Sequence, residues 1–235
     1  MAKADASQEP MDDRKVAVRE FWDRASCGEE LYLRGRDRLG YERQAQIRYE
    51  LEPYIPGFAR FEEARGRRVL EIGVGLGADH QRFAEAGAIL DGIDLTPRAI
   101  SFTEHRLSQF GLKSNLKLGD AEALAYPDDH FDVVYSWGVL HHSPDTPRAI
   151  SEVCRVLKRD GVARIMMYHK HSMVGYMLWL RYAFLKLRPT MTLMEIYAKH
   201  LESPGTKAYS IKEARHLFRS FRRVEISTQL TMAIS

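Results

Sequence analysis

The sequence contains few cysteines and has little net charge. Cys27 and Cys154 are the only cysteines in 235 residues, which excludes a disulfide framework and a cysteine-based zinc cluster. Lys and Arg number 35 against 32 Asp and Glu, and the basic residues are spread along the chain. A net charge of +3 therefore does not demand a nucleic acid as partner, and we expect none.

Long apolar runs are also missing. Residues 1–13 are polar and acidic and hold no apolar segment of signal-peptide length. The most apolar stretch, residues 171–188, is short for a bilayer span and is interrupted by Arg181 and Lys186. We therefore expect a cytoplasmic protein without a stable membrane span. Its length suffices for one α/β domain with appendages.

The chain does have a glycine-rich turn behind a short apolar run. Residues 67–77 read RRVLEIGVGLG, with Glu71 followed by glycines at alternate positions, Gly73, Gly75 and Gly77. The run suits a buried parallel strand, and the glycines suit a turn where backbone closely approaches a ligand. Asp94 ends a second apolar run about 20 residues further on, the spacing at which a carboxylate can hold a ribose. The pattern predicts an adenosine-containing cofactor.

The spacing of the glycines favours one cofactor over another. A dinucleotide fingerprint reads G-x-G-x-x-G around a pyrophosphate, whereas this turn reads G-x-G-x-G and follows an acidic residue. A carboxylate is unfavourable beside a diphosphate and favourable beside the ammonium of S-adenosylmethionine. We therefore expect S-adenosylmethionine, with Glu71 meeting its positively charged end. A nicotinamide-dependent oxidoreductase, or a non-catalytic protein retaining the cofactor fold, is the alternative.

Apolar runs and helical segments alternate along the chain, which is typical of an α/β fold. This alternation predicts a three-layer, Rossmann-like parallel sheet with right-handed crossovers and strands at 67–73, 88–94, 115–119, 131–137 and 162–168. A last strand is expected at 222–230, where too little chain follows for a hairpin partner, so we expect an incomplete antiparallel edge. The expected division is a helical cap (1–60), a cofactor-binding core (61–169), a helical insertion or lid (170–204), and a last helix and strand (205–235).

The insertion contains an unusual helix. Residues 171–188 are apolar on nearly every side, and such a helix favours burial. A lid over a substrate pocket, a homodimer contact, a membrane-surface contact and plain packing on the sheet all fit this pattern.

Further motifs follow the third and fourth expected strands. At Gly119–Glu122, the Asp120 carboxylate can accept from an adenine amino group, although an Asx turn is the alternative use. Together with residues 131–142 and 155–161, these motifs resemble class I S-adenosylmethionine-dependent methyltransferases. The branch of ubiquinone and menaquinone biosynthesis and small-molecule methyltransferases is nearest. The resemblance covers residues 67–169 and is weak elsewhere.

The resemblance implies an enzyme that transfers a methyl group to a small apolar or aromatic acceptor, on O, N or C. It also implies a role for each matching position. The turn and Glu71 would hold the methionine end, Asp94 would hold the ribose, and Leu95 would lie against adenine. Asp120 and Ala121 would bracket the adenine edge, and Ser136 and Trp137 would lie close to the sulfonium. The expected cofactor-binding residues are Glu71, Gly73, Gly75, Gly77, Asp94, Leu95, Asp120, Ala121, Ser136 and Trp137.

Methyl transfer from a sulfonium is an in-line displacement that needs alignment and exclusion of water. Some acceptors also need a general base, for which histidine has the suitable pKa. His141 and His142 lie near the expected methyl position and are the catalytic candidates. We expect no metal, because no acidic cluster accompanies the histidines. Substrate contacts are expected from Tyr41, Tyr49, His169 and Tyr176.

Overall fold

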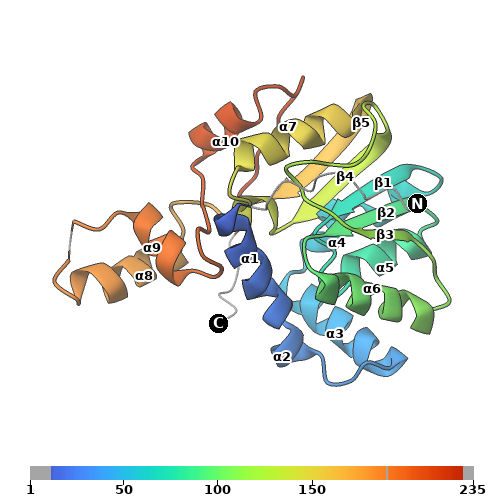
Figure 1. The fold of residues 1–235 in the computed structure, drawn as a ribbon, viewed down its shortest axis with the longest axis horizontal. Helices are drawn as coiled ribbons and strands as arrows, with labels where there is room; N and C mark the ends of the chain where they lie inside the picture. The colour runs from blue at the N-terminus through green and yellow to red at the C-terminus, as the bar shows by residue number, and fades with distance from the viewer. Residues whose placement is uncertain (1–11, 189, 230–235) are drawn as a thin grey trace, which may run out of the picture.

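The computed structural model describes residues 12–188 and 190–229. Its centre is a five-stranded sheet in the order β3-β2-β1-β4-β5, with every neighbouring pair parallel (Figure 1). The predicted α/β class and parallel sheet are therefore confirmed. The strands are β1 (Arg68–Ile72), β2 (Ile89–Asp94), β3 (Asn115–Leu118), β4 (Phe131–Trp137) and β5 (Leu157–Met166).

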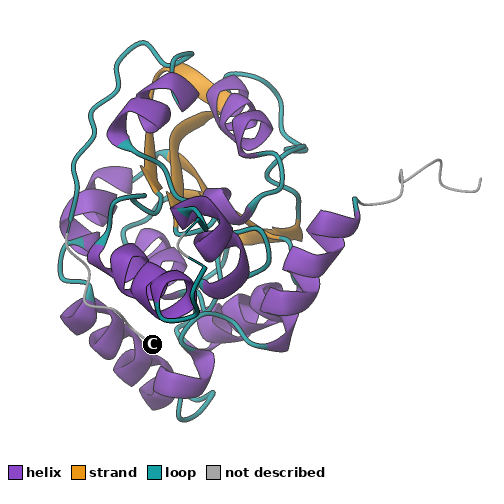
Figure 2. Cartoon of the chain, turned by 90° about the vertical axis from the view of Figure 1, so that its left-hand side faces the viewer, coloured by secondary structure: helices purple, strands orange, loops and turns teal. Residues whose placement is uncertain are grey.

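Helices cover both faces of this sheet, as Figures 1 and 2 show. Helices α5 and α6 lie on one face and α7 and α10 on the other (Figure 1). The helical elements are α1 (Asp13–Arg24), α2 (Glu29–Tyr32), α3 (Arg38–Leu51), α4 (Ile55–Ala59), η1 (Phe61–Ala64), α5 (Ala78–Glu85), α6 (Pro97–Gln109), η2 (Leu140–His142), α7 (Thr146–Val156), α8 (Met173–Trp179), η3 (Leu180–Phe184), α9 (Leu193–His200) and α10 (Ile211–Leu217).

The alternation of side chains along the strands divides the core into two layers. Val69 of β1 packs with Phe83 of α5, while its neighbour Leu70 packs with Ile150 of α7 on the other face. Both strand residues are fully buried, as expected for the central strand of a parallel sheet covered on both sides. The carboxyl end of β1, and the glycine turn after it, are thereby held between the two layers.

The last predicted strand is not found where the structure can test it. Residues 222–229 form no strand, and residue 230 lies outside the described residues. Arg222, Arg223 and Glu225 are exposed, and Val224 and Ile226 are only half-buried. The segment therefore buries too little apolar surface to anchor a strand against the sheet.

The apolar segment 171–188 is helical but is not buried. Helix α8 continues into one π-helical turn, η3, and α8 packs against α9. We call residues 171–188 and 190–200 the arm, and Figure 1 shows it projecting away from the sheet. Within the described residues, no helix combines the length and the hydropathy that crossing a membrane requires.

Candidate functional site

A cleft opens at the carboxyl ends of the strands, where open α/β sheets bind ligands. It encloses about 940 Å³ of empty space, including its open mouth. The sheet side is formed by the glycine turn after β1, by the end of β2, by Gly119–Glu122 after β3 and by the residues that follow β4. Helix α1 and the residues that follow it form the opposite wall, with Val18, Trp22 and Cys27 among them.

The glycine turn has two glycines that pack against protein and one that faces open space. A Cβ on Gly73, where φ is +83°, would lie 2.2 Å from a methyl of Val139. A Cβ on Gly77, the residue that precedes α5, would meet the side chain of Thr103 at 2.8 Å. Gly75 has φ of +52° and would meet nothing within 4 Å. Because Gly75 lines the cleft, its missing side chain leaves room for a ligand against the backbone.

Asp94 joins the end of β2 to the glycine turn. Its Oδ2 accepts a hydrogen bond from the backbone N of Gly75 at 3.2 Å, and Oδ1 accepts from the N and Oγ1 of Thr96 at 2.9 and 2.8 Å. Burial raises the pKa of Asp94, and these hydrogen bonds oppose that rise. Both Asp94 and Leu95 line the cleft, so the carboxylate is fixed in orientation at the point where the sequence predicts a ribose.

Glu71 lies elsewhere, and the expectation that it meets the positive end of the cofactor is not supported. The side chain is 3% exposed, does not line the cleft, and places Oε2 at 2.8 Å from Nδ1 of His80. Nε2 of His80 lies 2.8 Å from Oγ of Ser114, whose proton goes to the carbonyl of Leu90. His80 must therefore donate from Nε2, which leaves Nδ1 to accept a proton from the carboxylic acid of Glu71.

The pKa shifts of the pair agree with this proton arrangement. Burial, followed by the negative charge of Asp79, raises the pKa of Glu71 well above its ordinary value. Burial also lowers the pKa of His80 to about 3. Glu71 is thus a neutral acid that joins β1 to α5. Gly92 completes the arrangement, because a Cβ there would lie 2.6 Å from the His80 ring.

Replacing Glu71 with glutamine should stabilise the protein at alkaline pH. The raised pKa means that Glu71 contributes most below its unfolded value of 4.5, and that this contribution is lost as the pH rises toward the folded pKa. An amide can donate to His80 without taking up a proton. We expect the unfolding free energy of Glu71→Gln to exceed that of the wild type increasingly with pH, by about 2–4 kcal/mol more at pH 8 than at pH 5. Urea titrations at the two pH values measure this difference.

The matched control is Glu85→Gln, which alters a solvent-facing glutamate at the end of the same helix. It should leave the pH dependence unchanged. Cofactor affinity of Glu71→Gln should stay within about threefold of the wild type, because loss of a cofactor contact would cost about tenfold or more. A larger loss of affinity would restore the ammonium-binding role.

Asp120 and Glu122 form a polar network with helix α1. Nζ of Lys15 lies 2.5 Å from Oδ2 of Asp120 and 2.6 Å from Oε2 of Glu122. Oδ1 of Asp120 accepts from the N of Glu122 at 2.8 Å, which is the Asx-type contact considered above as the alternative. Although burial opposes it, the hydrogen bond from Lys15 lowers the pKa of Glu122. Helix α1 is thus fastened across the predicted adenine end of the cleft.

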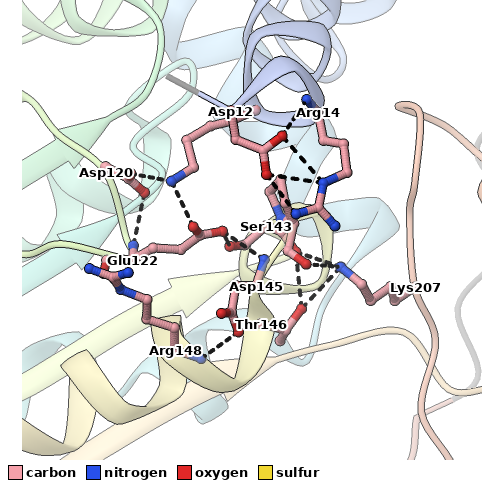
Figure 3. A network of polar contacts seen from close by, with 11 residues as sticks. Asp12, Arg14, Asp120, Glu122, Ser143, Asp145, Thr146, Arg148 and Lys207 are labelled. Carbon is pink, nitrogen blue, oxygen red and sulfur yellow. Dashed lines mark hydrogen bonds and ion pairs between the residues drawn. The ribbon is translucent and has the colours of Figure 1, made fainter. Parts of the chain in front are cut away.

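The network continues on the other side of Glu122 (Figure 3). Ser143 donates its hydroxyl to Oε1 of Glu122, and the N of Asp145 donates to the same oxygen at 2.7 Å. Lys207 donates to the carbonyl of Ser143 at 2.5 Å. Glu122 therefore holds the loop after β4 in place, although the sequence provided no specific reason to assign it that role.

The two catalytic candidates have different surroundings. His142 lines the cleft, and the Trp22 ring lies edge-on to it at 5.2 Å. Nδ1 of His142 lies 3.0 Å from Oγ1 of Thr206, which donates its own proton to the carbonyl of Ser203. Nδ1 also lies 2.8 Å from Oγ of Ser203, so two hydroxyls hold the ring through Nδ1, and a base at this position would act through Nε2. Nε2 makes no hydrogen bond and lies 3.3 Å from Oε2 of Glu202.

His141 is fully buried and does not line the cleft. Its ring lies between those of Tyr168 and His142, with centroid distances of 4.1 and 4.3 Å. Burial and the neighbouring His142 lower the pKa of His141 well below its ordinary value. A histidine that resists protonation is poorly suited to take up a proton, so the geometry favours His142 over His141 as a base.

The prediction of no metal site rested on the lack of acidic residues near the histidines, and the fold brings one there. Ligand atoms of His141, His142 and Glu202 lie within 4.8 Å of one another. The two imidazole rings are tilted by 42° to one another, with centroids 4.3 Å apart. Oε1 of Glu202 also accepts from Tyr168 at 2.9 Å. The reason for expecting no metal is therefore wrong, because an acidic residue does accompany the two histidines.

Several predicted site residues lie outside the cleft. The buried Ser136 donates to the carbonyl of Ile72 at 3.1 Å, and Trp137 stacks on Tyr54. The fully buried Tyr41 lies 3.1 Å from Nδ1 of His105, and Tyr49 donates to Asp79 at 2.9 Å. His169 pairs with Tyr209 in an isolated bridge, and Tyr176 is exposed on the arm. Ser136 and Trp137 lie within β4, whereas the cleft is formed by residues beyond the end of that strand.

Comparisons with known proteins identify the central segment. Residues 70–165 match the family described as methyltransferase domain. An uncharacterized methyltransferase, YcgJ of Bacillus subtilis, is 35% identical over 95 residues, which are 40% of this chain and 38% of that protein. A ubiquinone biosynthesis O-methyltransferase of Cereibacter sphaeroides is 34% identical over 142 residues, 60% of this chain and 56% of that protein. The chain thus spans about half the length of these curated relatives.

Solved structures support the same fold. The crystal structure of YcgJ from Bacillus subtilis superimposes with a TM-score of 0.57 at 24% identity, covering 73% of this chain and 68% of that chain. A SAM-dependent methyltransferase from Aquifex aeolicus gives a TM-score of 0.56 at 17% identity, covering 78% and 87%. At these identities the likeness shows the fold alone. The family match over residues 70–165 and this fold together favour a methyltransferase over the nicotinamide-dependent alternative.

Proposed function

We propose that the whole chain is a methyltransferase for a small acceptor, on the premise that residues 70–165 form a class I S-adenosylmethionine-dependent methyltransferase domain. The observation that carries the proposal is the single cleft wall made by the glycine turn, Asp94 and His142. These residues bring together a backbone platform, a fixed carboxylate and a base. We also propose a cytoplasmic location.

The cofactor would lie along the sheet edge. The turn from Gly73 to Gly77 would receive the methionine end, and Asp94 the two ribose hydroxyls. Leu95 would lie against adenine, whose edge would meet Asp120 and Ala121. Lys15 offsets the negative charge of Asp120 and Glu122, so that a neutral adenine can lie beside two carboxylates. Ser136 and Trp137 act behind this surface as structural supports.

Methyl transfer would proceed by in-line displacement. S-adenosylmethionine held by the glycine turn and Asp94 would supply an electrophilic methyl group, with S-adenosylhomocysteine as the leaving group. If the acceptor is a hydroxyl or an acidic carbon, its proton passes to Nε2 of His142, and Glu202 stabilises the resulting imidazolium. This arrangement needs water excluded from the cleft, which α1 provides by covering it.

The acceptor side of the cleft is largely apolar. Val18 and Trp22 come from α1, and Val139 and Leu140 from the segment after β4. Apolar and aromatic walls favour an apolar or aromatic acceptor. We propose that residues of α1 select this acceptor, since they face the cleft and lie outside the segment that matches the methyltransferase family.

Cofactor binding can be tested with two glycine variants that differ only in what faces them. Gly75 and Gly66 both have positive φ, +52° and +70°, and a Cβ on either would meet nothing within 4 Å. Alanine at either position should lower the unfolding free energy by about 1–2 kcal/mol, through backbone strain alone. Only Gly75→Ala places a methyl group in the cleft, and we expect it to weaken S-adenosylmethionine binding by about tenfold or more.

Isothermal titration calorimetry measures the affinity of the wild type and of both variants. We expect the wild type to bind S-adenosylmethionine in the micromolar range and NAD not at all. Equal affinities for Gly75→Ala and Gly66→Ala would argue against the proposed cofactor position. Tight NAD binding by the wild type without S-adenosylmethionine binding would overturn the function.

A further inference from the structure

The arm has an inner face that packs and an outer face that does not. On the inner side, a Cβ on Gly175 would lie 1.7 Å from the hydroxyl of Tyr197, so α8 and α9 are in direct contact. Nε1 of Trp179 donates to the carbonyl of Met191 at 2.8 Å, and Tyr182 stacks on His200 at 4.0 Å. These contacts fix the rotation of α8 about its own axis, and therefore which side chains face outward.

The outer face is a continuous apolar stripe, which we define as Met173, Tyr176, Met177, Leu180 and Phe184. Their spacing is i, i+3, i+4, i+7 and i+11, which places them on one side of a helix. All five are exposed, Met173 by 65% and Met177 by 62%. Leu185 and Leu187 extend the stripe at 68% and 90% exposure. Seven of the thirteen exposed large hydrophobic residues in the described chain thus lie within 15 consecutive positions.

The arm also carries the net charge of the protein. Residues 171–200 include Arg181, Lys186, Arg188 and Lys199 and only one acidic residue, Glu195. Since the whole chain has 35 basic and 32 acidic residues, the remainder has 31 of each and no net charge. All four cations are exposed. An arm that combines an exposed apolar stripe with exposed cations is complementary to a surface that is apolar inside and negatively charged outside.

We propose that the arm is a docking surface for an anionic lipid bilayer, with α8 and η3 lying in the plane of the interface. The 12 residues of α8 and η3 are about 18 Å long, which suits a helix lying on the surface and is too short for one crossing it. The stripe inserts among the acyl chains at the headgroup boundary, and the four cations meet lipid phosphates. This proposal does not depend on methyl transfer.

A second copy of the chain fits the stripe less well. Pairing two arms through their stripes would bring two groups of four cations together with one glutamate each, and like charges oppose such an approach. The docked arm also has a defined relation to the cleft. The chain leaves α9 through residues 201–206, which bring Glu202 and Thr206 against His142. Docking would hold that end of the cleft near the lipid.

Co-sedimentation of the full chain with lipid vesicles tests the proposal. Two vesicle compositions are needed: pure phosphatidylcholine, and phosphatidylcholine mixed with phosphatidylglycerol at about 3:1. The phosphatidylglycerol supplies the negative surface potential. We expect binding to the mixed vesicles to be about tenfold or more tighter than to the neutral ones. Met177→Ser with Phe184→Ser should weaken binding to the mixed vesicles by about tenfold or more, through loss of buried apolar area.

A charge variant separates the two contributions. Each cation near an anionic surface contributes about fivefold to binding, so Lys186→Gln with Arg188→Gln should cost about 25-fold on mixed vesicles and little on neutral ones. The matched control is Leu39→Ser with Leu118→Ser, two exposed leucines away from the arm, which should bind as the wild type does. Thermal unfolding verifies that each variant is folded.

Two results would overturn the proposal. One is equal binding of the wild type and the Met177/Phe184 variant to mixed vesicles, including no binding by either. The other is a concentration-dependent dimer in analytical ultracentrifugation that the Met177/Phe184 variant abolishes, while vesicles bind neither protein. The second result would assign the stripe to a second copy of the chain.

Discussion

Replacing His142 with glutamine is expected to lower kcat for methyl transfer by about 100- to 10,000-fold, the range that general-base catalysis contributes. His142 has the only imidazole in the described cleft wall, and its Nε2 makes no hydrogen bond and lies near the Glu202 carboxylate. The affinity for S-adenosylmethionine should stay unchanged, because no cofactor contact is assigned to the ring. Release of S-adenosylhomocysteine with a panel of phenols, enols and amines provides the assay.

Two further measurements distinguish a base from a structural residue. Added imidazole should restore part of the activity of His142→Ala, because a free base can enter the space that the ring leaves. Glu202→Gln should lower kcat more than it raises KM, since Glu202 acts on the imidazolium that forms during the reaction. His130→Gln is the matched control, because His130 pairs with Arg68 away from the cleft. Wild-type kcat in His142→Gln would eliminate the base.

Replacing Asp94 with alanine should weaken S-adenosylmethionine binding by about 100- to 1,000-fold. Two hydrogen bonds from ribose hydroxyls to a carboxylate contribute about 1.5–3 kcal/mol each, and a loss of 3–4 kcal/mol corresponds to this range. The carboxylate is already oriented by Gly75 and Thr96, so it loses little entropy on binding. Calorimetry measures the change directly.

Asp94 also supports the glycine turn, so a second variant is needed. Asp94→Asn keeps the shape and one accepting oxygen while removing the charge, and we expect a smaller loss of about 10- to 100-fold. Asp91→Ala provides the control, because Asp91 lies on the same strand, contacts Asn115 and does not line the cleft. Affinity within about threefold of the wild type in Asp94→Ala would contradict the ribose assignment.

The sequence predicted the first four strands well because their signals are local. The predicted ranges for the first four strands agree with β1 to β4 to within one residue at each end. Gly75 and Asp94 also lie together, as expected. Only α5 and two short connections separate the end of β1 from β2, so the spacing in sequence determines where Asp94 falls. These features depend on neighbours within about 20 residues.

The direction of Glu71 could not be obtained in the same way. Chemistry suggested a cation as its partner, whereas the pleat of β1 directs the side chain toward α5 and His80. His80 lies only nine residues further on, and its spacing from Glu71 across the turn is the one signal that could have revealed the pair. A buried acid can be satisfied by a neutral imidazole as well as by a cation, and sequence alone does not distinguish them.

Contacts between segments that are distant in the sequence could not be predicted either. Lys15 meets Asp120 from 105 positions away, and Glu202 reaches the side of His142 through a loop beyond the arm. Neither pairing has a periodicity or a motif. The arm shows the converse error, since its apolar composition predicted burial and the fold supplies a partner for one side only.

The bridge from Lys15 to Asp120 and Glu122 has a consequence for turnover. Helix α1 forms one wall of the cleft, so breaking this ion pair and moving the helix aside would widen the exit for spent cofactor. Dissolved salt weakens the attraction between partly exposed ions and should therefore hasten cofactor exchange.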